Sequence, residues 1–155
     1  MSARLELTTR SAAQTKKVGR VLGKFLRSGD VVALRGELGA GKTTLVKGIA
    51  KGLGVPDERA VASPTFVLMH EYAGRESVHH LDWYRLSAVR GADAELAEEC
   101  FAEGVTLIEW PERGRALLPR DAWQVRILHR GPSTRRLSFS FPGGADPRLL
   151  EALKR

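Results

Sequence analysis

Scarce residue types argue against several classes of protein for this chain. Cys100 is its single cysteine, which excludes an internal disulfide, and no group of cysteines and histidines has the spacing of a zinc finger. The chain contains no asparagine, so it lacks the Asn-Lys-x-Asp element with which Ras-like GTPases read guanine. No run of residues approaches the roughly 20 apolar positions that a membrane span needs. These absences leave a globular enzyme or binding protein.

Length and composition favour one globular domain. The chain has 155 residues, of which 43% are hydrophobic and 28% are charged. This length is close to the commonest domain size, so we expect a single domain over residues 1–155. The first ten residues carry charge where a secretory signal peptide needs an apolar core, so we expect a cytoplasmic protein.

The net charge of +7 is concentrated near the C-terminus. Residues 113–155 hold ten Lys or Arg against three Asp or Glu, whereas residues 1–112 hold fifteen of each sign. Residues 93–112 contain seven acidic residues and no basic one. This asymmetry predicts an acidic face and a basic region that are available to steer partners or to contact RNA. A solvated surface is the plainer alternative, because arginines without interleaved aromatics are a weak signal for nucleic acid.

Hydrophobic spacing predicts helices and strands that alternate early in the chain and consecutive strands later. Helices are expected after a capping box at Ser11 and Gln14, with a stop at Gly29, and at 42–53, 94–102 and 149–154. Strands are expected at 31–34, 66–72, 78–83, 105–110, 125–128 and 137–141. This order predicts an α/β domain in which helices flank a mixed, largely parallel sheet.

A phosphate-binding loop is the most specific motif of the sequence. Residues 36–43 read Gly-Glu-Leu-Gly-Ala-Gly-Lys-Thr and match the pattern G-x-x-x-x-G-K-[ST] at every fixed position. The expected strand before it and helix after it are what the mechanism needs, because loop N–H groups and the helix N-terminus together bind phosphate. We therefore expect Lys42 to reach the β- and γ-phosphates and Thr43 to bind Mg²⁺. The glycines do not give G-x-G-x-x-G, which argues against dinucleotide binding.

Two acidic residues are candidates for the carboxylate that a phosphate loop needs near its metal ion. Glu109 ends the apolar run at 105–108, and Asp82 ends the strand-like run Val-His-His-Leu at 78–81. Either carboxylate suits Mg²⁺, which prefers oxygen ligands, and either would also orient an attacking water. The residues alone leave both assignments open.

Several classes of phosphate-loop protein remain after these motifs are placed. The chain has no Leu-Ser-Gly-Gly-Gln signature of an ABC ATPase and is too short for a helicase core. A small-molecule kinase stays open, because such kinases are also compact and close over phosphates with arginines. A nucleotide-gated binding module is a third, non-enzymatic hypothesis.

Three further blocks accompany the phosphate loop between about residues 10 and 120. They are Ser-Pro-Thr-Phe at 63–66 with Glu71 and Tyr72, His-Leu-Asp-Trp-Tyr-Arg-Leu at 80–86, and Leu-Ile-Glu-Trp-Pro-Glu at 107–112. Together with residues 36–44, in this order and spacing, they resemble the TsaE family, the small ATPases of bacterial tRNA threonylcarbamoyladenosine synthesis. The sequence departs from the family at 87–96, where Pro-Glu-Glu-Leu is usual, and shows no recognisable family motif after about residue 120.

The resemblance implies ATP and Mg²⁺ as cofactors and assigns roles by position. The implied nucleotide-binding residues are Gly36, Glu37, Leu38, Gly39, Ala40, Gly41, Lys42, Thr43, Thr44 and Trp110. The implied metal ligands are Thr43 and Glu109, and the implied catalytic residues are Lys42, Asp82, Glu109 and Thr65, the last near the γ-phosphate.

The resemblance also implies a partner complex. Proteins of this family act with the TsaB–TsaD heterodimer, which transfers threonylcarbamoyl from its adenylate to adenosine 37 of tRNA. The ATPase does not perform that transfer, and its hydrolysis resets the complex between turnovers. We therefore expect an ATPase that is weak alone and depends on its partners.

Overall fold

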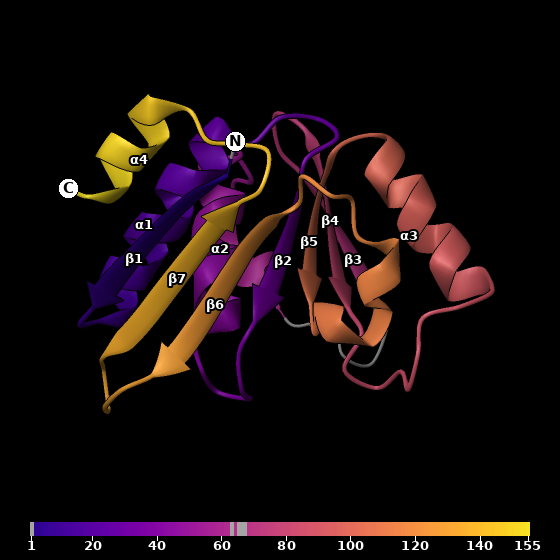
Figure 1. Cartoon of the computed structure of the whole chain (residues 1–155), viewed down its shortest axis with the longest axis horizontal. Coiled ribbons are helices and arrows are strands. Elements are labelled where there is room, and N and C mark those ends of the chain that lie inside the picture. The colour runs from indigo at the N-terminus through magenta and orange to yellow at the C-terminus, as the bar shows by residue number, and fades with distance from the viewer. Residues whose placement is uncertain (1, 63, 65–67) are drawn as a thin grey trace.

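The computed structural model describes residues 2–62, 64 and 68–155, and their strands form one sheet (Figure 1). The strands are β1 (Ala3–Thr9), β2 (Val31–Arg35), β3 (Met69–Ala73), β4 (Ser77–Asp82), β5 (Val105–Glu109), β6 (Trp123–His129) and β7 (Arg135–Phe141). Their order is β1-β7-β6-β2-β5-β4-β3. The four central strands β6, β2, β5 and β4 run parallel, and antiparallel strands flank them on both sides. The predicted α/β class and mixed sheet are confirmed.

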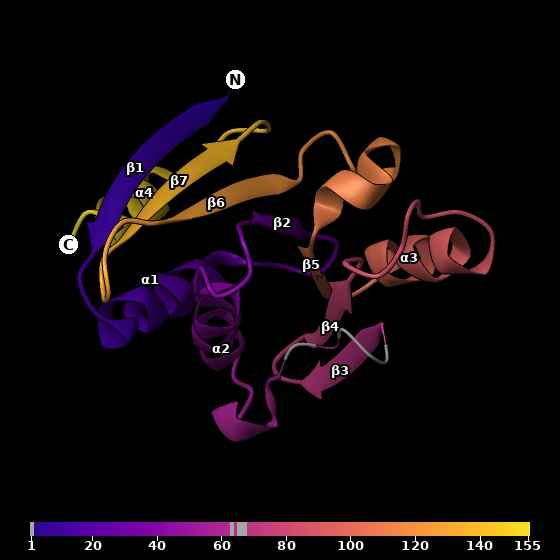
Figure 2. The ribbon, with the colours of Figure 1, turned by 90° about the horizontal axis from the view of Figure 1, so that it is seen from below.

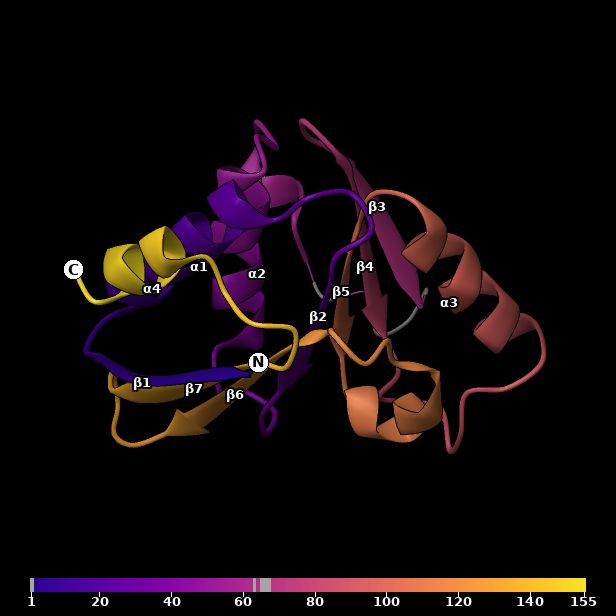
Figure 3. The same cartoon turned by 45° about the horizontal axis from the view of Figure 1, so that its top comes forward.

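Helices lie on both faces of the sheet (Figures 2 and 3). The helices are α1 (Ala12–Phe25), α2 (Lys42–Gly52), α3 (Ala92–Ala102) and α4 (Pro147–Leu153), with 3₁₀ segments η1 (Glu58–Ala60) and η2 (Pro111–Leu117). Strand alternation sends Val32 and Leu34 into a core with α1, α2 and α4, and Val31 into a second core with α3. Among the described helices, none is both long and apolar enough to cross a membrane.

Most predicted elements are present, with shifted ends. Ser11 caps α1 as predicted, because its hydroxyl accepts a hydrogen bond from the N–H of Gln14 at 3.1 Å. That helix ends at Phe25, before the predicted stop at Gly29. Residues 66 and 67 of the predicted 66–72 strand lie outside the described residues, and β3 begins at Met69. The sequence analysis missed β1, although its residues alternate between apolar and polar.

Helices α1 and α2 pack backbone against backbone, and this contact positions the phosphate loop. The close approach depends on glycines that face each other across the two helices. A Cβ atom at Gly48 would lie 2.2 Å from the carbonyl oxygen of Lys16 on α1. Since α2 starts at Lys42, the packing of these helices fixes the direction in which the loop presents its residues.

Replacing Gly48 by alanine is therefore expected to destabilise the protein. The methyl group would push the helices apart, and overpacking of this kind costs roughly 1–3 kcal/mol. Chemical denaturation of the two proteins measures the difference in the free energy of unfolding. Gly131→Ala is the matched control, because the added Cβ would meet only ordinary contacts, the nearest at 3.7 Å. A Gly48→Ala protein as stable as the wild type would contradict the role of this contact.

Candidate functional site

The predicted phosphate loop connects the carboxyl end of β2 to the start of α2. Gly39 and Gly41 adopt positive φ angles of 77° and 110°, which L side chains rarely adopt. Gly41 is the N-cap of α2, and no described side chain caps this helix end. The first-turn N–H groups of α2 therefore point into the loop without partners from a cap, as in an anion-binding site.

Lys42 places its ammonium group inside this loop. The side chain is only 5% exposed, and Nζ donates a hydrogen bond of 2.5 Å to the carbonyl oxygen of Gly36. Burial lowers the pKa of Lys42, and the negative charges of Glu109 and Asp82 oppose that shift. The loop thus holds a desolvated cation that a phosphate group would stabilise.

Asp82 and Glu109 lie side by side at the carboxyl ends of β4 and β5. Their Cα atoms are register partners in the parallel pair, and their side chains are 2% and 3% exposed. Asp82 accepts a hydrogen bond of 2.8 Å from the N–H of Tyr84, so it also caps the turn after β4. Both candidate carboxylates therefore lie at the carboxyl ends of parallel strands, at the same end of the sheet as the phosphate loop. Ligands bind at this end in parallel α/β sheets.

A chain of buried polar groups leads from Glu109 into the sheet. His80 Nε2 lies 2.6 Å from Oε2 of Glu109, and His80 Nδ1 lies 3.2 Å from the hydroxyl of Tyr72. That hydroxyl donates in turn to the carbonyl oxygen of Ala62 at 3.3 Å. His80 therefore fixes the orientation of the Glu109 carboxylate. The sequence analysis did not assign this role, although alternation along β4 puts His80 on the same face as Asp82.

Trp110 covers Lys42 from the other side. The residue has a left-handed backbone with φ 58°, and its ring centre lies 4.1 Å from Nζ of Lys42. The ring of Tyr84 packs on the indole with centroids 4.9 Å apart. Burial of a lysine against an aromatic ring strengthens the cation–π attraction. The indole is therefore positioned to respond when a ligand displaces the lysine.

The remaining predicted site residues differ in their burial. Thr43 and Thr44 are half-buried in the first turn of α2, whereas Glu37, Leu38 and Gly39 are exposed at the tip of the loop. Ala40 is buried behind them. Thr65 lies outside the described residues, so its predicted place near the γ-phosphate stays a prediction.

Similarity to known proteins agrees with this arrangement. The sequence model of the family described as threonylcarbamoyl adenosine biosynthesis protein TsaE matches residues 9–137. The chain belongs to the TsaE family. It is 44% identical over 130 residues to the tRNA threonylcarbamoyladenosine biosynthesis protein TsaE of Treponema pallidum, covering 82% of this chain and 95% of that protein.

Further relatives cover nearly the whole chain. The TsaE protein of Bacillus subtilis is 37% identical over 152 residues, which cover 97% of this chain and 94% of that protein. The crystal structure of Bacillus subtilis YdiB superposes with a TM-score of 0.76 at 32% identity, covering 100% of this chain and 97% of that one. The resemblance to the TsaE family that the sequence blocks indicated is thus confirmed.

The match to the TsaE family also extends past residue 120, where the sequence showed no recognisable family motif. Within this stretch, Arg135 of β7 donates from Nε to the carbonyl oxygen of Ala40 at 2.7 Å. Its Nη1 donates to the carbonyl oxygens of Gly131 and Thr134, both at 3.0 Å. Arg135 thus ties the β6–β7 turn to the phosphate loop, a contact that the sequence analysis missed.

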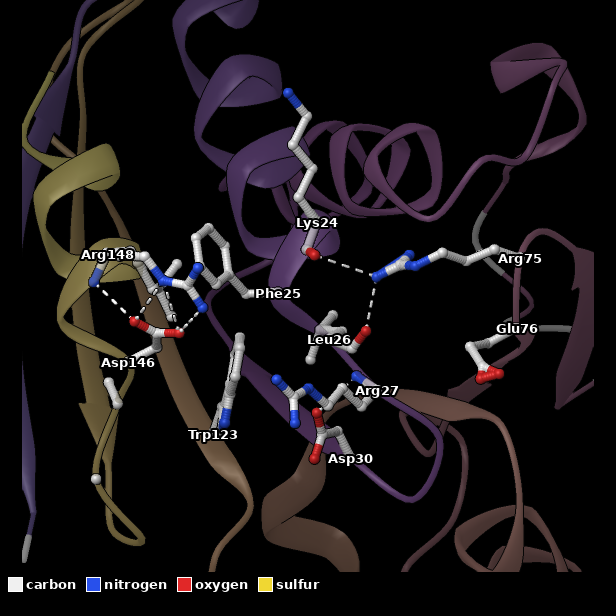
Figure 4. A pocket seen from close by; sticks show the side chains of 13 residues that line it. Lys24, Phe25, Leu26, Arg27, Asp30, Arg75, Glu76, Trp123, Asp146 and Arg148 are labelled. Atoms are coloured by element: carbon white, nitrogen blue, oxygen red, sulfur yellow. Dashed lines mark hydrogen bonds and ion pairs between the residues drawn. The ribbon is translucent and has the colours of Figure 1, made fainter.

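A further cavity, shown in Figure 4, is lined by none of the predicted site residues. It measures about 750 Å³ and lies near Asp30 and Trp123, at the starts of β2 and β6. Three of its charged lining residues already have partners: Arg75 caps α1 by donating to the carbonyl oxygens of Gly23 and Leu26, and Arg148 pairs with Asp146. These contacts hold helix ends in place, so the cavity is not the candidate site.

Proposed function

We propose that this protein is a Mg²⁺-dependent ATPase that supports threonylcarbamoyladenosine modification of tRNA together with the TsaB–TsaD heterodimer. The observation that carries the proposal is the position of Lys42, buried in a phosphate loop next to two buried carboxylates. Membership of the TsaE family supports the tRNA pathway. Family resemblance is the support for the TsaB–TsaD complex.

The loop residues bind and orient the triphosphate of ATP in this proposal. The backbone N–H groups of Gly39 and of residues 41–44 would face the phosphates, whereas that of Ala40 donates to the carbonyl oxygen of Glu37. Lys42 would exchange the Gly36 carbonyl for β- and γ-phosphate oxygens. The environment of the Trp110 ring changes with this movement, because the ring lies against the ammonium group. The exchange favours binding, because a charged phosphate is a better partner for a desolvated ammonium than a carbonyl oxygen.

The residues near the loop fit a bound Mg²⁺ ion. Thr43 supplies a hydroxyl from the first turn of α2, and Glu109 supplies a buried carboxylate. Among the described residues, no three His, Cys, Asp or Glu side chains form a metal cage. Two protein ligands agree with the usual coordination of Mg²⁺, which keeps waters and takes phosphate oxygens. A Mg²⁺ ion held by these residues would neutralise charge that develops on phosphate oxygens.

Asp82 and Glu109 have different roles near the γ-phosphate in this proposal. Glu109 is held by His80, which fixes its carboxylate in one orientation for the metal. Asp82 is buried at the neighbouring strand end and orients the attacking water. We expect hydrolysis to be slow until the partner complex completes the site, as in other switch-like phosphate-loop proteins.

The test measures ATP hydrolysis and modified adenosine in the same reaction, with and without purified TsaB–TsaD. We expect the partners to stimulate Mg²⁺-dependent hydrolysis and the protein to raise the product beyond one turnover per complex. Hydrolysis that ignores the partners, with modification equally fast without the protein, would contradict the proposal. Phosphate that appears on a small-molecule acceptor would instead identify a kinase.

A further inference from the structure

A basic groove lies on the open face of the sheet, outside the site described above. The face of β1, β7 and β6 opposite α1 and α2 carries no helix of the described part of the chain (Figure 2). Between this face and the segment that follows η2 lies a groove of about 560 Å³. Its charged lining residues are Arg4, Arg35, Arg115, Arg120, Arg126 and Glu6. Five positive charges therefore face one negative charge.

The groove arginines are not neutralised within the protein. Glu6, the one acid of the lining, is already paired with Arg136 of β7. Among the described residues, none of the five guanidinium groups has a hydrogen-bond or ion-pair partner, and Nε of Arg35 is buried without one. Arg35 and Arg126 are also register partners on adjacent strands. Like charges placed directly opposite each other destabilise a sheet, so the arrangement favours a bound anion.

The chemistry of the groove suits a phosphate backbone better than a protein surface. Arginine presents a planar fork of donors that matches phosphate oxygens, and Gln124, Ser138 and Ser140 add neutral hydrogen-bonding groups to the lining. Protein interfaces depend on exposed aromatic or aliphatic anchors. Leu38 is the only large hydrophobic side chain exposed among the described residues, and it lies in the phosphate loop outside the groove.

We propose that this groove binds the phosphate backbone of tRNA. The proposal rests on the proposed function, which supplies tRNA as the polyanion that the protein meets. Arg35 and Arg126 also line a pocket of about 320 Å³ with Gly36 and Trp110. A tRNA backbone bound in the groove would therefore extend to the rim of the nucleotide site, beside the phosphate loop.

The test measures binding of fluorescently labelled, unmodified tRNA to the full chain by anisotropy over a range of salt concentrations. The test variant combines Arg4→Gln, Arg115→Gln and Arg120→Gln, which are exposed groove positions outside the nucleotide pocket. We expect at least a tenfold loss of affinity and a salt slope reduced by roughly 2 to 3, because each phosphate contact contributes about 0.9. Substitution of the same three residues by lysine should retain most of the affinity.

A matched control makes the same change in net charge on the opposite face of the sheet, which α1 and α2 cover. Lys17→Gln, Arg20→Gln and Lys51→Gln together remove three exposed charges from α1 and α2, and this protein should bind tRNA like the wild type. Equal losses in both triple variants would overturn the proposal, because general charge would then explain binding. Unchanged tRNA binding with lost binding to TsaB–TsaD would also overturn it and make the groove a protein interface.

The same measurements separate this proposal from the proposed function. Thermal unfolding checks that each triple variant is folded, and ATP binding should be unchanged in the glutamine variants. A wild-type protein that binds tRNA through the groove but hydrolyses no ATP with its partners would contradict the proposed function alone. A protein with partner-stimulated hydrolysis and no groove-dependent tRNA binding would contradict the groove alone.

Discussion

Replacing Lys42 by alanine is expected to lower the affinity for ATP at least 100-fold. The ammonium group is desolvated in the free protein, and the two phosphate contacts proposed for it would be charge-assisted hydrogen bonds worth roughly 1.5–3 kcal/mol each. Isothermal titration calorimetry with ATP and Mg²⁺ measures the affinity directly. Calorimetry is chosen because the Trp110 ring lies 4.1 Å from the ammonium nitrogen, so removal of Lys42 would itself change the fluorescence response.

Lys51→Ala is the matched control for this experiment. Lys51 lies exposed in the last turn of the same helix, so its removal makes the same change in net charge away from the phosphate loop. It should bind ATP like the wild type. Because the Lys42 side chain itself fills the space under Trp110, a Lys42→Met variant that keeps the volume should show the same loss of affinity. ATP affinity that survives in both Lys42 variants would remove the basis of the nucleotide site.

The phosphate loop was predictable because all its parts are local in the sequence. The strand before residue 36, the glycines that permit positive φ and the helix that begins at Lys42 follow one another without a gap. Asp82 and Glu109 were predictable as a pair for a similar reason. Each ends a buried run, and parallel strands bring their carboxyl ends to one edge of the sheet.

The parts that sequence reasoning missed depend on contacts between distant residues. Arg135 reaches Ala40 across 95 positions, and no pattern around either residue indicates the other. His80 contacts Glu109 only because β4 and β5 are neighbours in a particular register. Strand β1 lies at the sheet edge beside β7, a pairing that short-range periodicity does not specify. Its alternation of apolar and polar residues was nevertheless a readable signal.

Glu109→Gln is expected to separate ATP binding from hydrolysis. Glutamine keeps the volume of the buried side chain and an oxygen that accepts a hydrogen bond from His80, so the fold should be retained. If Glu109 binds the metal ion as proposed, loss of its negative charge weakens that site, so hydrolysis with the partner complex should fall roughly 100-fold, since changes even to the residues behind metal ligands cost about 10–100-fold. ATP affinity should change less than about threefold, because charge-assisted contacts from Lys42 and the loop N–H groups carry it.

The Mg²⁺ dependence of hydrolysis shows which of the two carboxylates, Glu109 or Asp82, binds the metal ion, a question that the sequence left open. If Glu109 binds the ion, Glu109→Gln should raise the Mg²⁺ concentration needed for half-maximal hydrolysis at least about tenfold, since even outer-shell changes cost that much. Asp82→Asn should then lower the rate without moving this Mg²⁺ midpoint, because Asp82 would act on the water. The opposite pattern would exchange the two roles. Glu98→Gln on the exposed face of α3 is the control for loss of one carboxylate, and both the rate and the Mg²⁺ midpoint should stay at their wild-type values.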